Sequence, residues 1–282
     1  MQKGATHLWA NTILFGSHPL QAASSLDKHA KKIKLIGQPP LLVDEYDDKN
    51  FVNALLRKDP RFCLPDSRIL NCANPSCVFG LRYPIVGKPI RGRGSHGVKV
   101  CRTEQELCAH LEVILRESPL VMVEEFLSGE EGTVTIMPPS LQNPDYRALP
   151  IVVRFNHADG IAPYNGIVAV TQNSRVPSSS ELESDSAYAD ISKQCVQVAE
   201  KLRVTAPIRI DVRRISKVSG APFAMFDINM KPNMTGPGRP GREDQASLTA
   251  LAAERLGWDY ARLLSEVLES AKTLEHLRGV YL

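Results

Sequence analysis

The sequence lacks the cysteine and histidine spacings that hold structural zinc. Its six cysteines include no Cys-x-x-Cys pair and have no histidine cluster at zinc-finger spacing, and such short spacings are what zinc-binding motifs require. Nothing in the chain indicates secretion, so we expect the thiols to be reduced and mostly buried. They are Cys63, Cys72, Cys77, Cys101, Cys108 and Cys195.

Long apolar runs, internal repeats and a strong net charge are also missing. No apolar stretch is long enough to span a bilayer, and residues 1–15 are too interrupted for a signal peptide. A formal net charge of +3 over 282 residues does not favour nucleic acid or an anionic membrane as a partner. We therefore expect a cytoplasmic protein of one large lobe or two to three small ones.

A glycine-rich loop matches known phosphate-binding motifs only in part. Gly92 to Gly97 reads Gly-x-Gly-x-x-Gly, but the alternating residues Val98 to Cys101 predict a strand, whereas a dinucleotide-binding loop opens a helix. No Walker lysine follows, and the kinase motifs His-Arg-Asp and Asp-Phe-Gly are absent. A strand, glycine loop and strand still suit a lid over phosphates, with Arg91, Arg93 and His96 adding charge. A flexible surface hairpin is the alternative.

The predicted elements favour an α+β chain. Residues 63–76 and 178–180 read as loops, and the capping box of Thr103 and Glu106 marks the start of one helix. Because no helix separates the strands between residues 120 and 171, their sheet should be mostly antiparallel. We expect strands at 10–15, 33–36, 83–89, 98–100, 120–127, 133–137, 151–155 and 166–171, and helices at 20–32, 47–56, 103–115, 188–202, 246–256 and 259–274.

Two further strands, Ile208 to Val212 and Met225 to Asn229, carry candidate metal ligands. Both alternate with a period of two, which places Arg209 and Asp211 on one face of the first strand. In the second strand Asp227 and Asn229 share a face, and Phe226 lies on the opposite one. Aligned faces would gather three oxygen ligands that suit Mg²⁺. The alternative is a solvated polar face of an antiparallel sheet.

Five motifs, taken in order over about residues 46 to 240, resemble the ATP-grasp superfamily and most closely its D-alanine:D-alanine ligase branch. They are Asp48-Lys49, Val86 to Pro89, Val123 to Glu131, Arg209 to Val212, and Asp227 to Thr235. The resemblance implies an α+β ATP-grasp fold in which two lobes with antiparallel sheets clasp ATP. It implies a reduced N-terminal β-α-β unit at 1–45, a small lobe with the glycine lid at 46–123, and a large lobe with the metal site at 124–282.

The resemblance also implies the nucleotide contacts. Lys49 and Lys88 would neutralise phosphate charge, and Ser95 in the lid would bind the transferring phosphate. Glu124 would accept a hydrogen bond from the adenine amino group, and Glu131 would bind the ribose hydroxyls. The segment Glu125, Phe126 and Leu127 would meet the ring edge, mainly through backbone groups. An acidic strand end at 124–125 and a solvated turn at 130–131 are the alternatives.

At the reacting centre, Asp211, Asp227 and Asn229 correspond to ligands for one or two Mg²⁺ ions. Arg209 resembles the arginine that holds the acyl phosphate and then the oxyanion, and its alternative role is a surface ion pair with Asp211. The implied reaction is ATP-dependent ligation of a small-molecule carboxylate and an amine, in a possible homodimer. A non-ligating nucleotide-binding protein and a kinase-like phosphotransferase on the same core are the alternatives.

The chain departs from the family at four places. Its N-terminal region is shorter than usual, and a phosphate lysine expected near Asn165 is missing, for which Lys231 or Arg154 could substitute. The second carboxylate ligand is Asp227, where glutamate is commoner. Residues 236–242 replace the usual substrate loop, and Arg239 and Arg242 could clamp a substrate carboxylate. Solvated arginines are the alternative for that loop.

Overall fold

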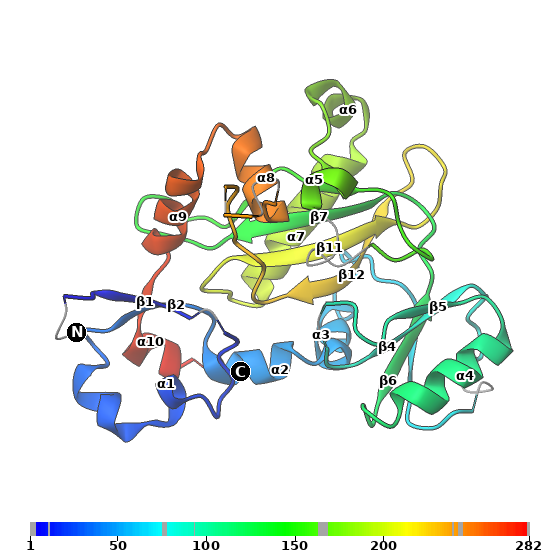
Figure 1. The fold of residues 1–282 in the computed structure, drawn as a ribbon, viewed down its shortest axis with the longest axis horizontal. Helices are drawn as coiled ribbons and strands as arrows, with labels where there is room; N and C mark the ends of the chain where they lie inside the picture. The colour runs from blue at the N-terminus through cyan, green and yellow to red at the C-terminus, as the bar shows by residue number, and fades with distance from the viewer. Residues whose placement is uncertain are drawn as a thin grey trace.

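Three β-sheets organise the molecule, one in each part of Figure 1. A six-stranded sheet lies at the centre, a four-stranded sheet at the lower right and a three-stranded sheet at the lower left. The computed structural model describes residues 4–10, 12–74, 78–92, 94–162, 169–238, 240–241 and 245–280. No helix in these ranges is long and apolar enough to cross a membrane.

The four-stranded sheet carries the glycine loop. Its order is β3-β6-β4-β5 and all its pairs are antiparallel. Thr103 caps helix α4 (Glu104–Ile114), because its side chain accepts from Glu106 N, and the helix buries Leu107, Leu111 and Ile114 against the sheet. The loop prediction for residues 63–76 was wrong in part, because pairing with β6 makes a strand there. The strands are β3 (Ser67–Leu70), β4 (Ile85–Pro89), β5 (Lys99–Cys101) and β6 (Val121–Glu125).

The six-stranded sheet has the order β10-β9-β7-β11-β12, with β8 paired to β7. Every pair is antiparallel, which confirms the prediction. The predicted strand at 166–171 lies partly outside the described residues, and its last two residues begin helix α5 (Val170–Asn173). The strands are β7 (Glu131–Met137), β8 (Arg147–Ala148), β9 (Val152–Arg154), β10 (Ser174–Arg175), β11 (Ile208–Arg214) and β12 (Phe223–Asn229).

The two faces of this central sheet differ in how far they are covered. On one face Ile208, Ile210 and Val212 pack with helix α7 (Ala187–Lys201) in the largest core cluster, as their alternation predicts. On the other face, helix α8 (Leu248–Arg255) covers part of the sheet, where Thr135 and Thr249 are hydrogen bonded at 3.0 Å. The rest of that second face stays open, and it carries the polar residues of β7, β11 and β12.

The three-stranded sheet joins both ends of the sequence. Strands β1 (His7–Trp9) and β2 (Lys34–Ile36) are parallel, and β13 (Lys272–Thr273) adds antiparallel to β2. The predicted strand at 10–15 was therefore wrong, because the pairing lies earlier. The predicted helix at 259–274 was too long, since α9 ends at Glu269. The nearby helices are α1 (Pro19–Ala22), the 3-10 helix η1 (Ser24–His29), α2 (Pro40–Tyr46), α3 (Lys49–Leu56), α9 (Tyr260–Glu269) and α10 (Leu274–Arg278).

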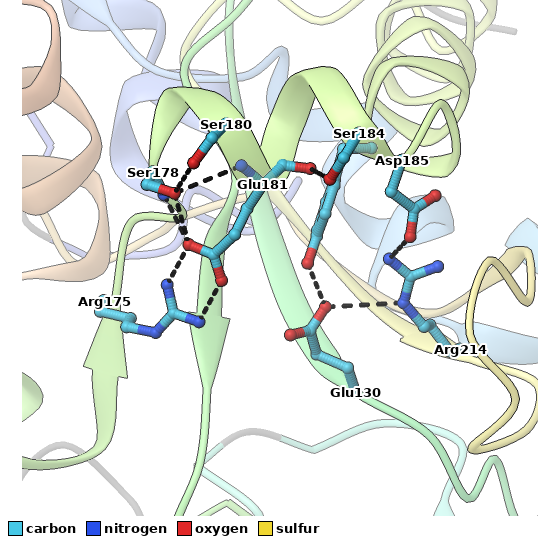
Figure 2. Close-up of polar contacts among 9 residues, drawn as sticks. Glu130, Arg175, Ser178, Ser180, Glu181, Ser184, Asp185 and Arg214 are labelled. Atoms are coloured by element: carbon cyan, nitrogen blue, oxygen red, sulfur yellow. Dashed lines mark hydrogen bonds and ion pairs between the residues drawn. The ribbon is translucent and has the colours of Figure 1, made fainter.

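An ion pair fastens α6 (Ser179–Ser184) to β10, and a hydrogen bond from Tyr188 to Glu130 fastens the start of α7 beside β7 (Figure 2). Ser178 and Glu181 form a capping box, so residues 178–180 are a helix start rather than the predicted loop. Arg175 binds the Glu181 carboxylate with both terminal nitrogens, at 2.9 and 2.7 Å.

The five described cysteines form no disulfide, and Cys101 and Cys195 are buried.

Candidate active site

A cleft with about 880 Å³ of empty space lies between the four-stranded sheet and the open face of the central sheet. Its walls come from β4, β6, the glycine loop, β7, β11 and β12, so residues far apart in sequence meet there. Ten predicted site residues line it: Lys49, Lys88, Ser95, Glu124, Glu125, Phe126, Leu127, Glu131, Asp211 and Asp227.

The pairing of β11 with β12 builds the floor of the cleft. Asp211 lies directly opposite Asp227, and Arg209 lies opposite Asn229 one same-face position further along. The pattern therefore predicted correctly that these four residues share one face. A shift in register after Asp211 makes Phe226 the extra residue of a bulge. The side chain of Phe226 consequently lines the cleft, which corrects its predicted place on the opposite face.

Arg209 and Asp211 form a bidentate ion pair within the floor. Arg209 Nε and Nη2 each donate to a separate oxygen of Asp211 at 2.8 Å, and Thr133 Oγ1 donates to Asp211 Oδ1 at 2.8 Å. Both charged side chains are only 14 % exposed, so the alternative of a surface pair fails on burial. Burial alone would raise the pKa of Asp211, but the Arg209 guanidinium outweighs it and lowers that pKa.

Lys88 and Glu124 form a second buried pair, on the opposite wall. Lys88 Nζ lies 2.6 Å from Glu124 Oε1 and donates to the Phe226 carbonyl at 2.8 Å, which ties the two lobes together. Burial raises the pKa of Glu124, although Lys88 opposes that shift. Glu124 Oε2 is buried without a hydrogen-bond partner. An orphaned carboxylate oxygen is costly in a folded protein, and a ligand donor would satisfy it.

Lys49 reaches the floor from the start of α3. Asp48 caps this helix by accepting from Asn50 N and Phe51 N, as its sequence predicts. The cap fixes Lys49 as the first helical residue, and its ammonium lies 3.1 Å from the Gly92 carbonyl and 3.5 Å from Asp227 Oδ1. Lys49 thus sits between the glycine loop and the acidic floor.

Three basic side chains surround Glu131, which the sequence prediction did not foresee. Glu131 is 5 % exposed and lies 2.9 Å from His157 Nε2, 3.5 Å from Arg213 Nη1 and 3.7 Å from Arg154 Nη1. Burial lowers the pKa of Arg154 and of Arg213. The two-residue period of β11 already placed Arg213 on the face of Arg209 and Asp211, whereas no sequence signal pointed to His157.

The glycine loop forms part of the cleft wall. Ser95 lines the cleft with a positive φ of 60°, between Gly94 and Gly97, which also have positive φ. A side chain on Gly97 would collide with Ile114, so the loop packs directly on α4. Two of the basic residues expected at this loop pair with acidic side chains. His96 Nε2 lies 2.7 Å from Glu117 Oε2, and Arg91 Nη2 lies 3.5 Å from Asp48 Oδ2.

Some predicted residues lie elsewhere. Arg239 and Arg242, like Arg93 and the region of Asn165, fall outside the described residues. Of the two proposed replacements for the missing lysine, Arg154 lines this cleft, whereas Lys231 lines a second cavity. Within the described ranges no three His, Cys, Asp or Glu side chains form a metal-binding group. A divalent cation at the floor would therefore depend on the amide oxygen of Asn229 and on ligand phosphates as well.

Two lobes with antiparallel sheets, a glycine lid and an acidic floor define the ATP-grasp class of proteins. A family model described as the D-ala D-ala ligase C-terminus matches residues 70–269. The chain belongs to this family.

Individual relatives agree with the family. D-alanine–D-alanine ligase A of Bacillus cereus is 28 % identical over 199 residues, which cover 71 % of this chain and 58 % of that protein. D-alanine–D-alanine ligase of Syntrophotalea carbinolica is 27 % identical over 194 residues, with 67 % and 54 % covered. The chain thus spans little more than half the length of these curated relatives.

Solved structures show the same fold. The D-alanine–D-alanine ligase of Bacillus anthracis complexed with ATP has a TM-score of 0.67 at 22 % identity and covers 100 % of this chain and 82 % of its own. VanG D-Ala:D-Ser ligase from Enterococcus faecalis has a TM-score of 0.65 at 17 % identity, with 97 % and 73 % covered.

Proposed function

We propose that the chain is an ATP- and Mg²⁺-dependent carboxylate-amine ligase. In this reaction ATP phosphorylates a carboxylate, and an amine then displaces phosphate from the acyl phosphate to leave an amide. The observation that carries the proposal is the floor of the cleft, where the pair Asp211 and Asp227 adjoins the pair Arg209 and Asn229. The family model over residues 70–269 and the relatives that are named D-alanine–D-alanine ligases support it.

Nucleotide binding follows from the polar groups of the walls. An adenine amino group would give the buried, unpartnered Glu124 Oε2 the donor that it lacks. Lys49, Lys88 and Arg154 line the same cleft and would neutralise phosphate oxygens. Arg154 would thereby take the place of the missing lysine. The lid around Ser95 would exclude water from the acyl phosphate.

The floor fits Mg²⁺ in its donor chemistry. Asp211, Asp227 and Asn229 offer hard oxygen ligands on one face, and Asn229 Oδ1, which accepts from Lys231 N at 2.9 Å, keeps a second lone pair. The ion would offset the charge of the transferring phosphate. Arg209 donates one hydrogen bond to each Asp211 oxygen and Thr133 donates one to Oδ1, so Asp211 Oδ2 keeps a second lone pair for the ion. Arg209 would contact the acyl phosphate from beside this oxygen.

The reaction is tested by incubating the protein with Mg²⁺-ATP and pools of carboxylates and amino acids. Ligation yields ADP, free phosphate and a product whose mass is the sum of two substrates minus water. A phosphorylated product without free phosphate would point instead to a kinase-like phosphotransferase. Tight ATP binding without turnover on any pool would point to a nucleotide-binding protein that does not ligate.

A further inference from the structure

A short turn after β9, residues 155–162, contributes to the wall of the active-site cleft. Its backbone is closed by two hydrogen bonds of 2.9 Å, one in each direction between Ala158 and Ile161. Gly160, inside the turn, has a positive φ of 81°. Gly160 and Ile161 are among the residues that line the cleft, and His157 is not. His157 therefore acts on a ligand in the cleft only through another side chain.

Arg213 fixes this turn against the two lobes. Its Nη1 donates to the Gly160 carbonyl at 2.7 Å and its Nε donates to the Gly129 carbonyl at 3.1 Å. The guanidinium also lies 4.8 Å from the centroid of the Phe126 ring, and a Cβ on Gly160 would lie 3.2 Å from that ring. Two Arg213 nitrogens thus donate to backbone carbonyls, and Glu131 Oε2 lies 3.5 Å from Nη1.

His157 supplies the hydrogen bond that orients Glu131. Its Nε2 lies 2.9 Å from Glu131 Oε2, and Nε2 donates because a carboxylate oxygen accepts. The two side chains are 17 % and 6 % exposed, so the bond is largely shielded from water. Glu131 Oε1 lies 3.7 Å from Arg154 Nη1, beyond hydrogen-bond distance. Among the described residues, His157 therefore holds one carboxylate oxygen, and the other stays available to a ligand.

Glu131 lies one step along β7 from the acidic floor. The strand register pairs Thr133 with Asp211 and Glu131 with Arg213. Two residues of a strand span about 7 Å, so Glu131 is set back by that distance from the proposed metal-binding position. In ATP the ribose joins the base to the phosphates, and its hydroxyl groups can donate to a carboxylate. With the phosphates on the floor, the ribose hydroxyls come within reach of Glu131.

We propose that His157 is a positioning residue for nucleotide selection: it orients Glu131 so that Oε1 accepts from the ribose 2′-hydroxyl. The protein thereby prefers a ribonucleotide to a 2′-deoxyribonucleotide. The inference rests on the proposed function, because it needs a nucleotide in this cleft. A carboxylate that is turned away loses its charge-assisted hydrogen bond to the 2′-hydroxyl, whereas the contacts to base and phosphates remain. The effect therefore lies in the ratio of two affinities.

This ratio is measured by calorimetric titration of the full chain with ADP and with 2′-deoxy-ADP, both with Mg²⁺. We expect the parent to bind ADP at least about tenfold more tightly. His157→Leu removes the donor and should reduce this preference to about threefold or less. His157→Gln keeps an N–H group near the position of Nε2 and should hold the preference within about twofold of the parent.

A double substitution shows whether His157 acts through Glu131. Glu131→Gln should itself remove the preference, and adding His157→Leu should then change the ratio by less than about twofold. His157→Asn, whose amide stops one carbon short, replaces the leucine variant if that variant does not fold. His276→Leu, an exposed histidine on α10, is the control and should change neither affinity.

The two proposals fail separately. A parent without the preference, or equal losses of affinity for both nucleotides in His157→Leu, would overturn the role of His157 and leave the ligase function standing. A ratio that responds as expected, in a protein that yields no ADP with any substrate pool, would support His157 and overturn the ligase function. No saturable binding of either nucleotide by the folded protein would overturn both.

Discussion

Two charged clusters lie at the same end of the central sheet, built from residues adjacent in sequence. Glu130 and Arg214 belong to the cluster in Figure 2, whereas Glu131 and Arg213 line the cleft. In the first cluster Arg214 binds Asp185 at 2.7 Å and Glu130 at 3.5 Å, and Tyr188 donates to Glu130 at 2.6 Å. Successive strand residues point to opposite faces, so one step along the chain separates the two environments.

The two clusters differ in whether their charged groups find their partners within the protein. The Arg214 guanidinium is 8 % exposed and lies over the rings of Tyr188 and Phe223, and it also donates to the Ala221 carbonyl. Its partners come from within the protein, so this cluster stabilises the fold. The cleft contains similar pairs but leaves Glu124 Oε2 without a partner. A buried charged group that lacks a hydrogen-bond partner is typical of a binding site, whereas charged groups that are fully paired with one another are typical of a structural contact.

The largest expected effect is a loss of turnover when charged residues of the cleft are replaced. Arg209→Ala and Asp227→Ala should each reduce turnover by at least about a hundredfold, because fixed charge at the reacting centre is worth several kcal/mol. Initial rates of ADP and amide formation measure this loss. The melting temperature should change little for Asp227→Ala, since that side chain is 31 % exposed. Turnover within about tenfold of the parent would mean that these groups do not touch the reacting atoms.

The structural cluster should respond in stability instead. Arg214→Met removes one member of a buried, paired network and should lower the free energy of unfolding by about 3–5 kcal/mol. Urea unfolding measures it, and affinity for a non-hydrolysable ATP analogue should remain within about twofold. Arg213→Met is the matched variant on the cleft face, and we expect it to weaken ATP-analogue binding by roughly tenfold. The same loss of affinity in both variants would erase the distinction between the clusters.

Sequence patterns predicted the parts of the site that follow from strand periodicity. Because side chains alternate along a strand, the shared face of Arg209, Asp211, Asp227 and Asn229 could be stated before their pairing was known. The bulge at Phe226 could not, since it depends on a one-residue shift between two strands. Its consequence is local, yet it brings an aromatic ring into the cleft and aims the Phe226 carbonyl at Lys88.

Contacts between residues far apart in sequence could not be predicted from the sequence. Strand β13 is two residues long and has no periodic signal, so its pairing with β2 was missed and α9 was extended too far. The contact of His157 with Glu131 likewise joins a loop to a strand 26 residues away. The buried pair of Arg209 with Asp211 was considered only on the surface, because burial depends on how the opposite lobe covers the floor.

A smaller effect concerns the end of the cleft where we propose that adenine binds. Glu124→Gln replaces an accepting oxygen with a donor, so it should weaken ATP binding by about ten- to hundredfold and reduce the preference for ATP over GTP. Calorimetric titration with both nucleotides gives the two constants. Glu112→Gln, on the exposed side of α4, serves as the control. An unchanged preference between ATP and GTP would separate Glu124 from base recognition.

The smallest expected effect is a pH-dependent change in the stability that the structural cluster contributes. Burial, together with the hydrogen bond to Glu130, raises the pKa of Tyr188 to about 12 from the usual 10.0. A group whose pKa is higher in the folded state stabilises the fold fully below its unfolded value and loses that contribution as pH rises through its folded value. The stability gap between the parent and Tyr188→Phe should therefore shrink from pH 10 toward pH 12. Urea unfolding at several pH values measures the gap, and a gap that stays constant over this range would show that the Tyr188 hydroxyl titrates alike in both states.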